Sequence, residues 1–227
     1  ASNVVGTANA TAVGWGNAGG GTTQALMPLV LAAIVMFGVE QSLGWRIALL
    51  VPGFMMIAVA FLYWKFTQDS PQGNFKELRA QGIDTDSGKK GGWAVMAQAS
   101  RNYRVWILAG TYGACFGVEI FMHNILAMYY VEKFGFGLKE AGLTAGILGL
   151  LALFARSLGG ILSDKVAIIK GLDGRTRLLF IMILGEGLFL ILFSQMNVAH
   201  WAILSMFVFA LFINMACGAT YAMVPFI

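Results

Sequence analysis

An arginine inside an apolar run has the most distinctive chemistry in this sequence. Arg156 stands in "GLLALFARSLGGILSDK", eight residues before Asp164, which on a helix places it about 12 Å inside the run. Burying such a charge in hydrocarbon costs at least about 2.5 kcal/mol, so it usually marks a functional cavity. Its planar fork of donors suits a planar oxyanion such as nitrate, nitrite or a carboxylate. We therefore expect Arg156 to bind a small anion; the alternative is a structural ion pair with Glu119 or Glu186.

Two further ionisable side chains lie four residues apart in another apolar run. Glu119 and His123 stand in "GVEIFMHNILAMYY", and this spacing brings them together on one helix face. They could share a proton, so both are candidates for proton coupling. The alternative, especially for His123, is hydrogen bonding between helices. Glu186, in "LGEGLF", is flanked by glycines and is either a packing residue or a functional one.

The glycine-rich stretch "GWGNAGGGTTQ" (residues 14–24) raises a choice between two structures. It fits the pattern G-x-G-x-x-G, but a dinucleotide-binding loop must follow a buried strand and open an amphipathic helix. Here small polar residues precede it and a fully apolar run follows, so a membrane helix is favoured. Such a helix has a face almost free of side-chain bulk, which admits a substrate or, alternatively, a tightly packed helix. The residues of this face and its edge are Gly14, Gly16, Asn17, Gly20, Gly21 and Gln24.

The composition places these residues in a membrane. The sequence is 58% hydrophobic and only 11% charged, and a soluble domain could not bury so much apolar surface. Six apolar segments have about the length that crosses a bilayer, roughly 20 residues: 11–37, 47–66, 105–131, 141–163, 178–193 and 201–227. We predict an all-α membrane protein. The sequence begins without Met, has no recognisable signal peptide and ends within an apolar run, so we expect an internal fragment of a longer chain.

The charged residues concentrate between the second and third segments, in a polar linker over 67–103 with a short helix expected at 74–81. This linker and the loop around 165–177 hold most of the 15 Lys and Arg residues. Because basic loops stay in the cytoplasm, the linker is predicted to be cytoplasmic. The cations are dispersed over loops, which argues against nucleic-acid binding. The two cysteines and two histidines lack metal or haem spacing, so we expect no cofactor, no metal and no enzyme.

Several stretches together resemble the nitrate/nitrite porter family of the major facilitator superfamily. "GTANATAVGWGNAGGGTTQ" (6–24) is similar to the family's glycine-rich nitrate signature on the fifth helix. "ARSLGGILSDK" (155–165) and "GRTR" (174–177) are similar to the eighth helix and the loop motif that follows it. "FGVEIFMHNILAMYY" resembles helix seven of the eukaryotic branch, and "GATYAMVPFI" (218–227) resembles the end of helix ten.

The resemblance implies a major facilitator bundle, of which this chain would hold about six transmembrane helices, numbers five to ten of twelve. Residues 1–66 would close the N-terminal half, 67–103 would link the halves, and 104–227 would open the C-terminal half. By the same likeness Arg156 is one of two anion-clamping arginines, with Asn17, Gly16, Gly20 and Gly21 beside the site. A conformational gate would include Gly160, Asp164, Lys165 and Arg175, and Lys165 replaces a common arginine.

The function expected from these observations is secondary transport of nitrate, or of nitrite, by alternating access and with proton coupling. The expected location is the plasma membrane, as a multi-pass protein in contact with the lipid bilayer. A single-span accessory protein is a further partner that some eukaryotic relatives require. The alternatives are a transporter of another small anion and a membrane scaffold subunit in which Arg156 forms a structural pair.

Overall fold

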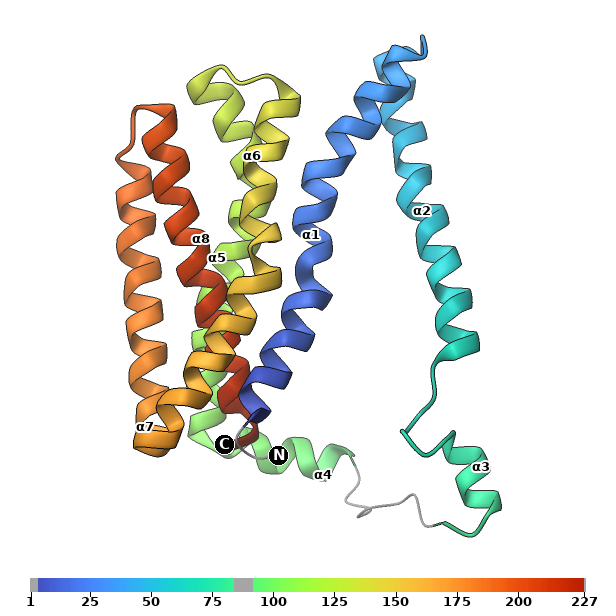
Figure 1. Ribbon diagram of the computed structural model, residues 1–227, viewed down its shortest axis with the longest axis vertical. Helices are drawn as coiled ribbons and strands as arrows, with labels where there is room; N and C mark the ends of the chain where they lie inside the picture. The colour runs from blue at the N-terminus through green and yellow to red at the C-terminus, as the bar shows by residue number, and fades with distance from the viewer. Residues whose placement is uncertain (1–3, 84–91, 227) are drawn as a thin grey trace. The chain divides into compact units, whose positions relative to one another are not determined.

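The computed structural model describes residues 4–83 and 92–226, and nearly all of them lie in helices (Figure 1). Within these ranges the only strand-type pairing is an isolated bridge between Ser70 and Gly73. The helices are α1 (Val5–Met36), α2 (Gln41–Phe66), α3 (Phe75–Ala80), α4 (Gly92–Ser100), α5 (Tyr103–Phe134), α6 (Leu138–Leu150), α7 (Ala152–Ser194), α8 (Ala199–Met223) and the short 3-10 helix η2 (Val224–Phe226).

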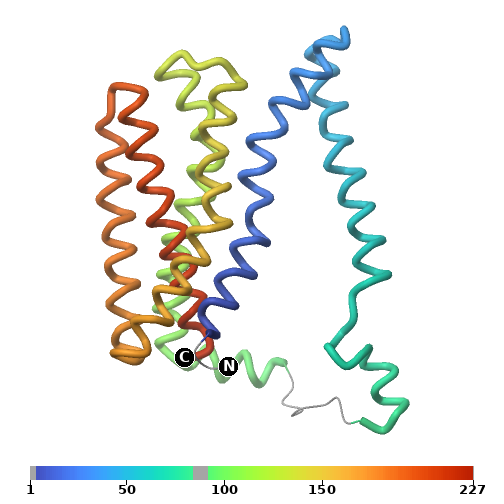
Figure 2. Tube along the Cα trace, in the orientation of Figure 1, coloured from blue at the N-terminus to red at the C-terminus, as the bar shows by residue number. Residues whose placement is uncertain are grey.

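Five helical stretches in the described residues are long and apolar enough to cross a membrane: Val5–Met36, Gln41–Phe66, Tyr103–Phe134, Leu138–Ser194 and Ala199–Phe226. The fourth stretch contains a reversal at Gly171, where φ is 59° and ψ is −143°. Glycine adopts such a conformation readily because it has no Cβ. Figure 2 shows the trace of α7 turning back at this point, so the stretch makes two passes. The predicted all-α membrane protein is confirmed.

A single residue, Leu151, separates α6 from α7 within the predicted span 141–163. Leu151, between the two helices, keeps a helical conformation and still donates to Ile147 O, so the chain continues in one direction. One turn earlier, Asn214 Nδ2 of α8 donates to Leu148 O over 3.2 Å. We attribute this interruption to the contact, because a side chain can insert into the ladder of backbone hydrogen bonds of a helix.

The chain divides into two compact units. One comprises residues 1–32 and 103–227, and the other comprises residues 33–102. The second unit holds α2, α3 and α4, and α2 buries only Gly44 and Ala48. The helix α3 lies within the short helix predicted at 74–81, whereas α4 was not predicted. Residues 84–91 of the predicted linker, and Ile227 of the last predicted span, lie outside the described residues.

In the first unit, α8 is buried along most of its length and packs against α5, α6 and α7. The turns that join α5 to α6 and α7 to α8 lie at one end of this unit, and the reversal of α7 lies at the other end (Figure 1). A hydrogen bond of 2.9 Å from Lys133 Nζ to Met196 O joins the two turns. Among the described residues, Arg156 has the largest fully buried side chain, followed by Tyr130 and Phe209.

Candidate functional site

Arg156 of α7 is completely buried and forms an ion pair across the bundle. Its Nη2 lies 2.6 Å from both Oε1 and Oε2 of Glu119 on α5. Its Nε donates to Asn214 Oδ1 of α8 over 3.1 Å. Of the two acids considered from the sequence, Glu119 is therefore the one that pairs with the arginine. Asn214 was not predicted, although an amide in an otherwise apolar helix was a signal for it.

The guanidinium retains one donor group that is not used. Arg156 Nη1 is buried and has no hydrogen-bond partner among the described residues. The ring of Phe116 lies beside the guanidinium, with its centroid 5.8 Å from Cζ. Buried donors are nearly always hydrogen-bonded in native structures, so Nη1 needs an acceptor. An oxygen atom of a small anion would supply one.

Two glycines let neighbouring helices approach the backbone around Arg156. A Cβ at Gly14 of α1 would lie 2.8 Å from Ala152 O and 3.0 Å from Arg156 Cβ. A Cβ at Gly218 of α8 would overlap the carbonyl group of Arg156. The arginine is therefore held between helices whose sequences omit side chains at the points of contact.

A second polar contact joins α1 to α5 beside this pair. His123 Nδ1 lies 2.9 Å from Gln24 Oε1, and Gln24 Nε2 donates to His123 O. Because the Gln24 oxygen can only accept, His123 Nδ1 carries a proton in this arrangement. On its other side, His123 Nε2 lies 3.8 Å from Glu119 Oε1. The hydrogen bond between helices that the sequence suggested for His123 is present, and a polar chain runs from α1 to Arg156.

The glycine-rich helix presents two different faces. Gly14 and Gly21 are buried, and the backbone of Gly21 lies against that of Gly149 in α6. Asn17, Gly16 and Gly20 are exposed, and nothing lies within 4 Å of a Cβ built at Gly16 or Gly20. The described structure thus brings Gly14 to Arg156 and does not bring Asn17 to it. Tight packing, the alternative weighed for this stretch, accounts for the buried face.

The residues of the predicted gate surround Asp164 near the start of α1. Asp164 Oδ2 accepts from Thr7 N at 2.7 Å and from Thr7 Oγ1 at 2.8 Å, and Oδ1 accepts from Gly6 N at 3.2 Å. Arg175 Nη2 lies 2.7 Å from Asp164 Oδ1. A Cβ at Gly160 would lie 2.7 Å from Gly6 O, so α1 and α7 touch here.

The structure differs from the predicted gate in two details, the position of Lys165 and the contact made by Thr7. Lys165 is exposed, whereas Arg175 is buried and also donates to Ser163 Oγ over 2.9 Å. Thr7 belongs to the stretch before the glycine-rich run, and no sequence pattern connects it with Asp164. The contact arises because the exposed N–H groups at the start of a helix attract a carboxylate.

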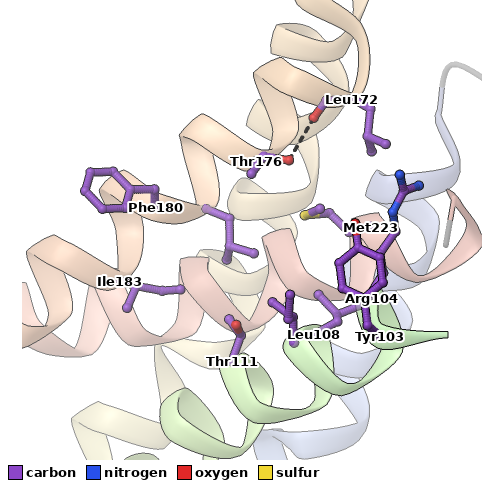
Figure 3. A pocket seen from close by; sticks show the side chains of 11 residues that line it. Tyr103, Arg104, Leu108, Thr111, Leu172, Thr176, Phe180, Ile183 and Met223 are labelled. Atoms are coloured by element: carbon purple, nitrogen blue, oxygen red, sulfur yellow. Dashed lines mark hydrogen bonds between the residues drawn. The ribbon is translucent and has the colours of Figure 1, made fainter. Parts of the chain in front are cut away.

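Two cavities among the described residues lie away from Arg156. A cavity of about 480 Å³ opens between α5, α7 and α8, and Figure 3 shows apolar side chains such as Leu108, Phe180 and Ile183 around it. Another, of about 240 Å³, lies against Asp164 and Arg175. Arg156 lines neither of them. In this conformation its unused donor is enclosed by protein.

Comparison with known proteins assigns the family. The family model described as Major Facilitator Superfamily matches residues 2–226, so this chain belongs to that superfamily. It is 39% identical to "High affinity nitrate transporter 2.5" of Arabidopsis thaliana, over 99% of this chain and 44% of the relative. It is 40% identical to "Nitrate transporter 2.1" of Chlamydomonas reinhardtii, over 99% of this chain and 41% of the relative.

A rice relative, "High-affinity nitrate transporter 2.3" of Oryza sativa subsp. japonica, is 38% identical over 98% of this chain and 43% of its own length. The chain thus spans less than half the length of these relatives. A search of solved structures found no match. The resemblance to nitrate/nitrite porters inferred from the sequence is confirmed.

Proposed function

We propose that this protein transports nitrate across a membrane by alternating access, and that Arg156 binds the anion. The observation that carries the proposal is the identity of about 40% to proteins named nitrate transporters, which extends over 99% of the chain. The residues give a chemical reason for the same substrate. A guanidinium offers planar, parallel donors, and nitrate is a planar oxyanion of matching geometry.

The ion pair of Arg156 with Glu119 suggests how binding and release would work. In the described conformation Glu119 occupies Nη2 and leaves Nη1 free. A nitrate ion that enters would take Nη1 first and then compete with the carboxylate for Nη2. The same guanidinium would return to Glu119 when nitrate leaves, so a buried charge would have a partner in both states.

The proposal includes coupling of nitrate transport to protons, a membrane location and an accessory partner. When nitrate displaces Glu119, its carboxylate loses its cationic partner and takes up a proton; Glu119 and its neighbour His123 are the proposed coupling residues. Nitrite would fit the same donors.

We further propose a plasma-membrane location with the linker 67–103 in the cytoplasm, and a single-span accessory protein as a partner. Asn17, Gly16 and Gly20 stay proposed site residues on the exposed face of α1.

Uptake of labelled nitrate tests the role of Arg156. In the protein at its full natural length, Arg156→Lys should lower uptake by about 10- to 100-fold, because one ammonium cannot replace the fork and charged hydrogen bonds are worth about 1.5–3 kcal/mol. The matched control is Arg177→Lys, since Arg177 is exposed and its ion pair is with the exposed Asp173.

Two results would contradict the proposal in different ways. Near-normal uptake by the Arg156→Lys variant would assign Arg156 to a structural pair with Glu119, as expected of a scaffold subunit. Competition of nitrate uptake by small carboxylates at equal concentration would favour a transporter of another anion.

A further inference from the structure

A second buried acid lies near the ion pair and has a different environment. Glu186 of α7 is only 6% exposed, and its Oε2 has no hydrogen-bond partner in the ranges that the structure describes. The ring of Phe212 packs against the adjacent Gly185, where a Cβ would overlap it. Glu186 is therefore fixed inside the bundle by helix packing, with an unsatisfied oxygen atom.

The groups that face Glu186 are acids and thiols. The thiol of Cys115 on α5 contacts its carboxyl group, and Glu119 interacts with it from the next turn of α5. From α8, Cys217 faces it as well. Arg156, the cation that pairs with Glu119, uses its Nη2 for that residue. None of the ion pairs formed by the described residues involves Glu186.

These surroundings determine the protonation state of the side chain. An ionised carboxylate without a cation is strongly disfavoured in an apolar interior and is neutralised by taking up a proton. Glu119 is different, because Arg156 compensates its charge directly. Two carboxyl groups close together in one bundle thus differ in charge, one ionised and one neutral, because only one of them has a cationic partner.

We propose that Glu186 holds a proton in the described conformation and is the proton donor to Glu119 in the transport cycle. This inference rests on the proposed function, since it begins when nitrate displaces Glu119 from Arg156. The O–H bond of Glu186 then breaks and an O–H bond forms at Glu119. The carboxylate left at Glu186 takes a proton from water on the side from which nitrate entered. When nitrate leaves on the opposite side and Arg156 pairs with Glu119 again, the O–H bond of Glu119 breaks and its proton passes to water on that side. Proton movement thereby accompanies nitrate in the same direction.

The test compares two activities of the protein at its full natural length in liposomes. Counterflow, the exchange of labelled for unlabelled nitrate without a pH gradient, requires binding and conformational change only. Accumulation driven by a pH gradient also requires the proton. Glu186→Gln replaces a neutral acid by a neutral amide of the same shape, so counterflow should persist while gradient-driven accumulation is lost. Glu132→Gln is the matched control, because Glu132 is an exposed acid of α5.

Accumulation by Glu186→Gln with the wild-type pH dependence would overturn the proposal, because a packing residue would then explain Glu186. Infrared spectroscopy of the purified protein provides a second measurement if this variant does not fold. Wild type should show the carbonyl band of a buried protonated carboxyl group, and Glu186→Asp should shift it; absence of the band would also overturn the proposal. Failure of wild-type counterflow would contradict the proposed function instead, and the infrared band would still decide the protonation of Glu186.

Discussion

The ion pair of Arg156 and Glu119 is buried, yet it leaves one donor group of the guanidinium unused. The arginine is completely buried and the acid almost so, which makes the loss of either partner costly. Yet Arg156 Nη1 has no partner among the described residues. Buried donors are nearly always hydrogen-bonded in native structures. At the scale of single residues, the unused donor is the feature that suits an anionic ligand.

Removal of the acid should therefore strengthen nitrate binding and slow its release. Glu119→Gln leaves a buried cation without its counter-charge, and breaking a buried pair in this way destabilises a protein by about 3–5 kcal/mol. Nitrate would then be the main compensating anion. We expect a lower melting temperature without nitrate, a larger rise on adding nitrate than wild type shows, a lower Kd and a slower turnover.

Thermal unfolding in detergent with and without nitrate measures the first two effects, and tracer binding and uptake measure the others. Glu140→Gln is a suitable control, because Glu140 is an exposed acid at the start of α6. Equal nitrate-dependent stabilisation of Glu119→Gln and wild type would show that the anion does not compete with Glu119.

At the scale of helices, glycine positions determine which surfaces meet. Gly21 of α1 lies against the backbone of Gly149 in α6, and Gly159 of α7 lies against that of Met215 in α8. Without side chains at these points the helix backbones approach closely, which favours packing within membranes. On α1 the buried glycines Gly14 and Gly21 lie on the packed face, whereas Gly16, Gly19 and Gly20 have open space beside them. One sequence stretch therefore provides both a packed face and a free face.

This difference predicts opposite effects for two neighbouring substitutions. A Cβ at Gly21 would overlap the backbone of Gly149 and Leu150, whereas a Cβ at Gly19 meets nothing within 4 Å. Gly21→Ala should therefore destabilise the protein by about 1–3 kcal/mol, the usual effect of overpacking. Gly19→Ala should be neutral or stabilise it by up to about 1 kcal/mol, because alanine favours the helix. Unfolding of the two variants under identical detergent conditions would measure this; equal stability would contradict the packing described for α1.

The sequence predicted the helices better than it predicted their contacts. Apolar runs identify membrane helices because the bilayer requires long, internally hydrogen-bonded segments. The reversal at Gly171 lies between the predicted spans 141–163 and 178–193, where the apolar run is interrupted by charged residues. The pairing of Arg156 with Glu119 rather than with Glu186, the part played by Asn214, and the contact of Thr7 with Asp164 depend on how helices rotate about one another. That rotation follows from glycine contacts between distant segments, which a single sequence does not reveal.

At the scale of the molecule, the start of α1 is tied to α7 near the reversal at Gly171. The Asp164 carboxylate accepts hydrogen bonds from the backbone N–H groups of Gly6 and Thr7 and from the Thr7 hydroxyl group. Arg175, which follows the reversal in the chain, donates to the same carboxylate. Arg175 also stacks on Phe226, the last described residue, with its Cζ 4.8 Å from the centroid of the ring. Alternating access requires that such a contact break at one stage of the cycle.

Loss of the Asp164 charge should therefore shift the protein toward a conformation open at this end. Asp164→Asn removes the ion pair with Arg175 and weakens the charge-assisted bonds to Thr7, each worth about 1.5–3 kcal/mol. Spin labels at the exposed positions Ala8 and Lys170 should report longer distances in this variant than in wild type. Asp173→Asn is the control, because its pair with Arg177 is exposed and such pairs contribute about 0–1 kcal/mol. Identical distance distributions in the Asp164→Asn variant and wild type would show that this contact does not hold the gate closed.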